Sequence, residues 1–197
     1  MRCLKIGLIL ATLVLFTGGC FFEPRQAEAP GGAVITYLPQ SQPENVIANI
    51  ETAMANTDPA GYERQIAEVF TYQPDSDTEA SYPDVDWASW DRAREIAFMN
   101  DFLGTIDGMV IDLRDEEIFT DWSGSEAELR YIYSVVVDEA GGTVPYRARV
   151  TLEFRLDGTF WVLTRWFDEQ GEEDPDSGSP LPPLGRRRGA FAAAGGG

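Results

Sequence analysis

The first half of the chain repeats apolar residues at the three- and four-residue spacing of an α-helix. Ser41-Gln42-Pro43-Glu44 has the form of a capping box with a proline in the first turn. The apolar positions that follow share one helical face: Val46, Ile47, Ile50, Ala53 and Met54. Asp58-Pro59 begins a second helix in the same manner, and Ser89 caps a third.

The second and third predicted helices also have one apolar face each. The second places Tyr62, Ile66 and Ala67 on that face and leads into a short extended segment at 70–72. An acidic, proline-containing loop over 73–88 follows. The third helix carries a longer apolar set: Trp90, Ala93, Ala97, Phe98 and Phe102. The pattern therefore predicts three helices before residue 106.

From residue 106 onward the period changes to two. Met109, Ile111 and Leu113 alternate with their neighbours, which is typical of a half-buried strand. Three longer strands are expected at about 127–138, 144–155 and 159–168, joined by turns at Gly141-Gly142 and Asp157-Gly158. Four consecutive strands with short turns predict an antiparallel meander.

The predicted turns assign side chains to one face of that meander. They set Leu129, Tyr131, Tyr133, Val135 and Val137 opposite Phe154, Leu152, Val150, Ala148 and Tyr146. The last strand adds Trp161, Leu163, Arg165 and Phe167 to the same face. Every member of this face is apolar or aromatic except Arg165.

Helices in the first part and strands in the second predict an α+β fold, with the helices on one face of the sheet. The element order, together with Pro43-Glu44-Asn45-Val46, Tyr62, Phe70-Thr71-Tyr72 and Trp90 with Glu95, resembles the cone-shaped nuclear-transport-factor-two-like superfamily. That superfamily includes ketosteroid isomerases, SnoaL-like cyclases and uncharacterised lipoproteins. The resemblance implies three N-terminal helices packed on a curved, mainly antiparallel four-stranded, cystatin-like sheet. Enzymes of the family use acids, tyrosines or histidines inside the cone, but no catalytic motif matches this chain residue by residue.

The N-terminus resembles a bacterial lipoprotein signal. Arg2 and Lys5 precede the apolar run 6–16, and Thr17-Gly18-Gly19-Cys20 places small residues before a cysteine. The resemblance implies that residues 1–19 are removed and that Cys20 is lipidated, which would anchor the protein to a membrane. Thr17 stands where the family usually has leucine, and an ordinary signal peptide or a short anchor helix is the alternative. Phe21, rather than aspartate, after the cysteine favours the outer membrane, facing the periplasm.

Proline and glycine content sets the remaining boundaries. Residues 20–40 show neither period and are expected to form a flexible linker, so the domain would span 41–169. Residues 170–197 are expected to form a disordered tail, because they are acidic and then rich in proline, glycine and alanine. The basic run 186–188 would be solvated there, or would contact phosphate or an acidic partner.

Composition excludes several kinds of chemistry. The chain has 197 residues, no histidine, and a formal net charge of -18 from 33 acidic and 15 basic residues. Histidine-dependent catalysis and zinc sites are therefore excluded, and nucleic-acid binding is disfavoured. Both cysteines, Cys3 and Cys20, fall in the first 20 residues, so the domain has no thiol nucleophile. We expect no metal and no cofactor.

Two groups of residues are candidates for a site inside the cone. Arg165, with Tyr131 and Tyr133 beside it, would bind an anionic ligand through its guanidinium. The alternatives are an internal ion pair of Arg165 with Glu95 or Asp101, since an unpaired buried charge is costly, and an Arg165 that reaches past the edge of the sheet.

The third helix supplies the second group: Asp91, Glu95 and Asp101. Asp91 and Glu95 are four residues apart and share a helical face. An apolar cone would raise the pKa of a carboxylate on that face, which would suit it to act as a general base. Ordinary charge pairing on a helix surface explains the same residues.

The opposite sheet face carries apolar residues among polar ones. It includes Trp166, Phe160, Val162, Ile132 and Val136. This face suits a sheet-to-sheet homodimer, and cover by the linker or the tail is the alternative.

These observations favour an envelope-anchored, non-enzymatic binding or interaction module for a small apolar or amphipathic ligand. A cone-fold isomerase, dehydratase or cyclase that uses a carboxylate and a tyrosine is one alternative. A scaffold lipoprotein with a filled cone is another, and a filled cone would exclude the enzyme.

Overall fold

The computed structural model describes residues 34–196, and residues 35–196 form one compact unit. The helices are α2 (Pro43–Ala55), α3 (Pro59–Glu63), α4 (Ser76–Ser81), the single 3₁₀ turn η1 (Trp87–Ser89), α5 (Arg92–Thr105) and α6 (Gly185–Ala193). The strands are β1 (Ile66–Gln73), β2 (Gly108–Ser123), β3 (Glu126–Glu139), β4 (Gly142–Asp157) and β5 (Phe160–Gly171). The predicted signal segment and Cys20 lie outside the described residues.

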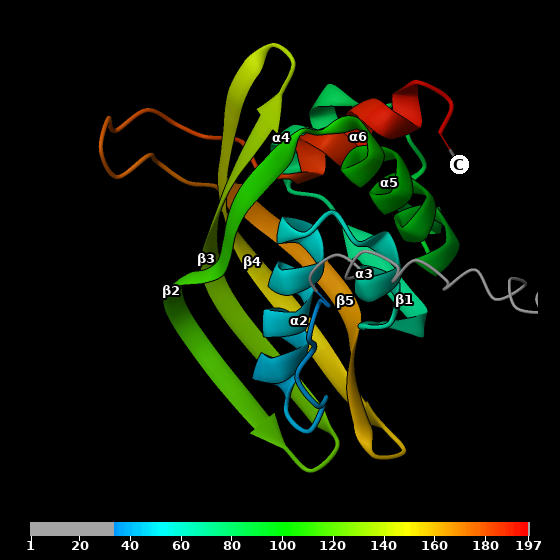
Figure 1. Cartoon of the computed structure of the whole chain (residues 1–197). Coiled ribbons are helices and arrows are strands. Elements are labelled where there is room, and N and C mark those ends of the chain that lie inside the picture. Colours follow the sequence, from blue (N-terminus) through cyan, green and yellow to red (C-terminus); the bar gives the residue numbers. More distant parts are fainter. Residues whose placement is uncertain (1–33, 197) are drawn as a thin grey trace, which may run out of the picture. The chain divides into compact units, whose positions relative to one another are not determined.

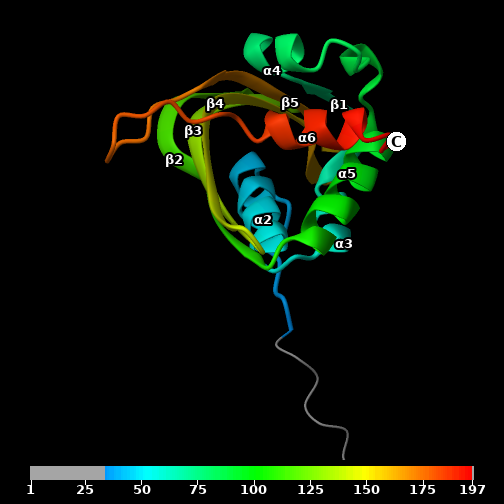
Figure 2. The same cartoon turned by 90° about the horizontal axis from the view of Figure 1, so that it is seen from above.

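The strands of the described unit form a five-stranded sheet in the order β1-β5-β4-β3-β2. The pairs among β2, β3, β4 and β5 are antiparallel, whereas β1 is parallel to β5. The sheet curves around α2, and α5 and α6 lie on the same concave side (Figures 1 and 2). The predicted α+β fold is confirmed. The count of four strands is not, because the extended segment at 70–72 belongs to the longer edge strand β1.

Helix α2 follows its predicted pattern. It begins at Pro43, and Val46, Ile47, Ile50, Ala53 and Met54 are all buried. In α3, Asp58 accepts a hydrogen bond from the backbone N–H of Gly61, as expected for an N-cap. Ile66 and Ala67 continue into β1 rather than into that helix. The cap of α5 is Asp91, which accepts from the Arg94 N–H, and not Ser89 as predicted.

The hairpin between β3 and β4 turns one residue earlier than predicted. Glu139 pairs with Gly142, so Tyr133 lies opposite Ala148 instead of Val150. This shift moves the partner by two positions. Because side chains alternate with period two, the apolar face is preserved, and Leu129, Tyr131, Tyr133, Val135 and Val137 are all buried.

A bulge in β5 changes which of its side chains face inward. Phe154 pairs with Leu163, but Glu153 pairs with Arg165, so β5 has one extra residue there. Beyond the bulge, Trp166 and Asp168 are fully buried, and Arg165 lies on the other face. The prediction of Arg165 on the concave face is therefore wrong, and so is that of Trp166 on the outer face.

The prediction of a disordered tail is also wrong. Residues 185–193 form α6, in which Gly185, Arg188 and Gly189 are buried. A Cβ at position 185 would collide with the Tyr72 hydroxyl and the Asp168 carboxylate, and one at 189 with the Tyr82 ring. Glycine at these two positions lets the helix backbone lie directly against the domain.

The end of the predicted linker is likewise part of the domain. The backbone N–H and C=O of Leu38 both bond to the buried Asn49 side chain, and Tyr37 donates to Asp58. Within residues 34–196, no helix is both long and apolar enough to span a lipid bilayer.

Candidate functional site

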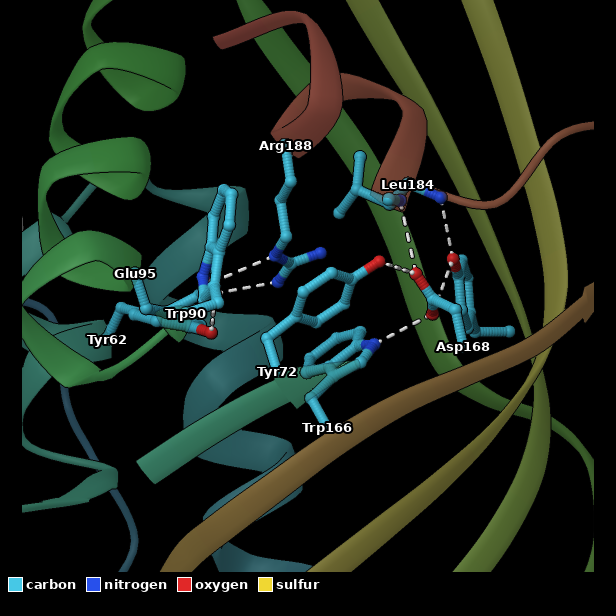
Figure 3. Close-up of polar contacts among 10 residues, drawn as sticks. Tyr62, Tyr72, Trp90, Glu95, Trp166, Asp168, Leu184 and Arg188 are labelled. Atoms are coloured by element: carbon cyan, nitrogen blue, oxygen red, sulfur yellow. Dashed lines mark hydrogen bonds and ion pairs between the residues drawn. The ribbon is translucent and has the colours of Figure 1, made fainter. Parts of the chain in front are cut away.

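A buried ion pair lies inside the curve of the sheet. From α6, Arg188 donates to Glu95 of α5 through Nε at 2.9 Å and through Nη2 at 2.6 Å. The two side chains are 1% and 0% exposed. Figure 3 shows Arg188 pointing inward from α6 toward Glu95. Two donors on two carboxylate oxygens form the fork arrangement that gives Arg–carboxylate pairs their strength and direction.

Two further donors saturate the Glu95 carboxylate. The Tyr62 hydroxyl donates to Oε1 at 2.7 Å, and the Trp90 indole N–H donates to Oε2 at 2.8 Å. Tyr62 and Trp90 are themselves buried. A buried carboxylate with four donors is fully hydrogen-bonded and stays fixed in place.

Aromatic rings surround the guanidinium of Arg188. Its Cζ lies 4.3 Å from the ring centre of Tyr72, 5.0 Å from that of Phe98 and 5.1 Å from that of Trp166. These distances are within the range of cation–π attraction. Among the described residues Nη1 has no hydrogen-bond acceptor, so the rings are its main contact.

A second buried carboxylate holds the start of α6. Asp168 accepts from Tyr72 at 2.8 Å, from the Trp166 indole at 2.8 Å and from Tyr133 at 3.2 Å. The backbone N–H of Gly185 donates to it at 3.1 Å, and that of Leu184 donates to the Tyr133 hydroxyl at 2.7 Å. These bonds fix the first residues of α6 against β3 and β5.

Burial dominates the electrostatics of this cluster. It raises the pKa of Asp168, and the charge of Arg188 opposes that rise only in part. Burial also raises the pKa of Tyr72 and of Tyr133 well above its usual value, and the nearby Asp168 charge adds to the effect. For Arg188, burial lowers the pKa, but the Glu95 charge, the hydrogen bonds to Glu95 and the nearby Tyr72 and Tyr62 together outweigh it, and the pKa ends well above its usual value. The guanidinium is therefore permanently charged, and both tyrosines are neutral donors.

The predicted site residues do not all lie together. Glu95 and Tyr133 belong to the cluster, whereas Asp101 is exposed on α5. Tyr131 is buried on β3, and burial raises its pKa to about 12. Arg165 lies on the outer face, where it donates to Glu153 at 2.7 Å and to Gln73 at 2.5 Å. One predicted alternative, an ion pair of Arg165 with Glu95 or Asp101, is therefore wrong, and the arginine that pairs with Glu95 is Arg188.

Sequence reasoning missed Arg188, Asp168, Tyr72 and Trp166. Arg188 belongs to the basic run 186–188, which indicated a solvated tail. One signal was available: Leu184, Arg188 and Phe191 recur at helical spacing, and Phe191 packs edge-on against Phe98 at 5.8 Å. Asp168 and Trp166 share a strand face, but only the bulge makes that face the inner one.

Buried side chains of the described helices and strands pack together on the concave side of the sheet. A surface hollow of about 330 Å³ reaches the cluster's edge, where it is lined by Tyr72, Trp90, Trp87 and Arg165. Glu95, Asp168 and Arg188 are not part of its wall. With these three side chains at most 1% exposed, solvent does not reach the buried charges.

No family model matches the chain, and no curated protein matches it. Solved structures do. One protein from Novosphingobium aromaticivorans, provisionally named an aromatic ring hydroxylase, is 15% identical, with a TM-score of 0.53 over 64% of this chain and 84% of its own. A second from the same organism, provisionally named a scytalone dehydratase, is 12% identical, with a TM-score of 0.53 over 73% of this chain and 91% of its own.

The chain has an NTF2-like fold. A Pseudomonas putida protein described as NTF2-like and of unknown function is also similar, at 14% identity and a TM-score of 0.49 over 72% of this chain and 92% of its own. The two structures with TM-scores of 0.53 confirm, for the fold alone, the resemblance drawn from the sequence to the cone-shaped superfamily. At such low identity the NTF2-like neighbours carry no further information on activity.

Proposed function

We propose that this chain is a non-enzymatic interaction protein in which the NTF2-like cone is closed by the chain's own C-terminal helix. The ion pair between Arg188 and Glu95 carries the proposal. It places a charged side chain of α6 in the interior where a substrate of a cone-fold enzyme would lie. The filled-cone scaffold is therefore favoured over a module with an open ligand cavity.

The same geometry disfavours an isomerase, dehydratase or cyclase. A general base must reach the proton that it removes, directly or through one water. Both oxygens of Glu95 already accept from Arg188, Tyr62 and Trp90. Asp168 lies near two tyrosines but is fully buried beneath α6. The enzyme names of the two Novosphingobium neighbours remain the reason to test for turnover.

We also propose that the protein is tethered to the outer membrane, on its periplasmic side, through lipidated Cys20. The support comes from the residues before Cys20 and from Phe21 after it. Cells grown with a palmitate analogue should label the wild type and not Cys20→Ser, whereas Cys3→Ser should still be labelled. Equal labelling of Cys20→Ser would contradict the anchor.

The interaction surface that we propose is the outer sheet face. Phe160 is 58% exposed and Val136 is 37% exposed, and Arg130, Arg149 and Arg165 lie on the same face of β3, β4 and β5. Exposed apolar residues among paired charges suit an interface that contains both. A second copy of the chain is the expected partner.

Native mass spectrometry of the mature chain tests the closed cone. We expect the polypeptide mass, or its dimer, without a copurified organic ligand, because Arg188 already fills the interior. Retention of a stoichiometric small molecule that survives gentle activation would contradict the proposal. Arg165→Met is the matched control, because it changes an arginine outside the cone.

A further inference from the structure

The groups that hold Arg188 form a complete binding site without α6. Glu95 and Phe98 come from α5, Tyr72 from β1 and Trp166 from β5. We call these four residues the cage. All of them precede residue 172, and Arg188 reaches them only after the mostly exposed segment 172–180. The receptor and its occupant thus belong to different parts of the chain.

The cage is shaped for a guanidinium and not merely for a positive charge. Two nitrogens of one plane meet the two oxygens of Glu95 at 2.9 and 2.6 Å. An ammonium is a compact point charge and has no matching fork. The Tyr72 ring, at 4.3 Å, adds a face against which a delocalised planar cation packs well.

The cage is also preorganised by its own donors. Trp90 and Tyr62 donate hydrogen bonds to the Glu95 carboxylate, and the Trp166 indole N–H donates to Asp168. None of these bonds involves Arg188. Groups held in their binding geometry lose little freedom when a ligand arrives, which favours affinity.

We propose that the cage is an alkylguanidinium-binding site, filled in this chain by Arg188 and able to bind the same group from another molecule when Arg188 is absent. This inference rests on the closed cone of the proposed function and names the ligand class of that site. The source of the group is either a small guanidino compound or an arginine on a polypeptide segment.

Arg188→Ala with ethylguanidinium is the experiment. The substitution removes two side-chain carbons and the guanidinium, which are the heavy atoms that ethylguanidinium contains. We expect a saturable rise in the Tm of Arg188→Ala of roughly 3–5 °C at ten times the dissociation constant, from mass action and the unfolding entropy of a domain of this size. The tryptophan fluorescence of the same samples should titrate with the same midpoint, since Trp166 lines the cage.

Three controls isolate the cage. For the same rise in the Tm of Arg188→Ala, n-butylammonium should require at least a tenfold higher concentration than ethylguanidinium, because an ammonium has no fork of two N–H donors. Ethylguanidinium should leave the wild type and Arg186→Ala unchanged, because both retain Arg188. The double variant Glu95→Gln/Arg188→Ala should lose at least tenfold in affinity for ethylguanidinium, because it lacks the carboxylate.

A peptide with the sequence of residues 184–193 distinguishes the two sources. Tighter binding of this peptide than of ethylguanidinium to Arg188→Ala, lost when lysine replaces its arginine at position 188, would assign the site to an arginine of a polypeptide. The chain's own α6 stays bound in Arg188→Ala through Leu184 and Gly185, so the peptide must displace it. Binding of ethylguanidinium alone would therefore show that only a small guanidino compound enters the cage beneath α6.

Absence of saturable binding of either probe by folded Arg188→Ala would overturn the inference, and the closed cone would stand if the wild type still copurifies with no ligand. If Arg188→Ala does not fold alone, its refolding yield with ethylguanidinium decides. Recovery that the ammonium does not reproduce supports the cage, and no recovery overturns it.

Discussion

Arg188 and Glu95 are 93 positions apart in the chain, yet they share two hydrogen bonds inside the cone, at 2.9 and 2.6 Å. This pair joins α6 to α5 across the open side of the sheet (Figures 2 and 3). It makes the C-terminal helix a structural part of the NTF2-like domain. The stability of the domain should therefore depend on residues near the C-terminus.

Glu95→Gln should destabilise the domain strongly. It leaves the Arg188 charge buried without its counter-ion, and breaking a buried pair from one side costs about 3–5 kcal/mol. Denaturant titration measures the loss. Asp101→Asn, on the exposed side of the same helix, should stay within about 0.5 kcal/mol. A Glu95→Gln loss as small as that of Asp101→Asn would show that the ion pair contributes little.

The sequence assigned Arg165 to the inner face, whereas the structure places Arg188 there. Replacing each of them by methionine should therefore change the stability of the domain by different amounts. Arg165→Met should change the free energy of unfolding by less than about 1 kcal/mol, because Arg165 is 36% exposed and pairs with Glu153 at the surface. Arg188→Met should cost about 3–5 kcal/mol, because it leaves the Glu95 charge unpaired. Equal effects in chemical denaturation would mean that the bulge in β5 is misplaced.

Tyr133→Phe should loosen the start of α6. It removes the hydroxyl that accepts from the Leu184 N–H and donates to Asp168, at a cost of about 1–3 kcal/mol for a buried group left unsatisfied. Hydrogen exchange at Leu184 and Gly185 should accelerate by more than tenfold. Tyr131→Phe, two residues earlier on the same strand, is the control and should leave both amides protected. Unchanged exchange in Tyr133→Phe would mean that the hydroxyl does not hold the helix.

Asp168 should make the domain less stable as pH rises. Its pKa in the folded chain is raised, chiefly by burial, above the ordinary value of about 3.9. The contribution of such a group is fully present below the ordinary pKa and is lost as pH rises through the raised one. From pH 4 upward, the unfolding free energy of the wild type should therefore fall relative to that of Asp168→Asn. A difference that is independent of pH would exclude this titration.

Phe160→Glu and Val136→Glu should convert the expected dimer to monomer. Each adds a negative charge to the outer sheet face of a chain that already has a net charge of -18. Sedimentation velocity at several concentrations gives the oligomeric state. Leu38→Glu, at a 49% exposed residue outside the sheet, should leave the dimer intact. A wild type that is monomeric at every concentration would disprove the interface.

Local patterns were sufficient for α2 and for the apolar face of the antiparallel strands. The five apolar residues of α2 are all buried, because a 3.6-residue period places them on one side whatever they pack against. The apolar face of β3 was also predicted correctly, although the hairpin register was two residues away. A shift by two keeps every side chain on its face, so this error had no structural consequence.

Two features escaped local reasoning because each depends on residues far apart in the chain. One feature is the N-cap of α5, which is Asp91 and not Ser89. Thr71 of β1 pairs with Asp91, and this pairing sets the start of the helix. The extra residue of β5 depends on pairing with both β4 and β1. It moves Arg165 outward and brings Trp166 and Asp168 inward.

The sequence by itself determined the α+β class, helices α2, α3 and α5, the four antiparallel strands, and the absence of histidine or thiol chemistry in the domain, because these follow from composition and from short-range periodicity. It did not predict α4 or the full length of β1. Only the tertiary structure decided that the tail forms α6 and that α6 places Arg188 on the concave side of the sheet. A run of three arginines is a solvated segment unless a carboxylate and aromatic rings elsewhere in the chain provide a place for one of them. Glu95 and its surrounding rings provide that place for Arg188.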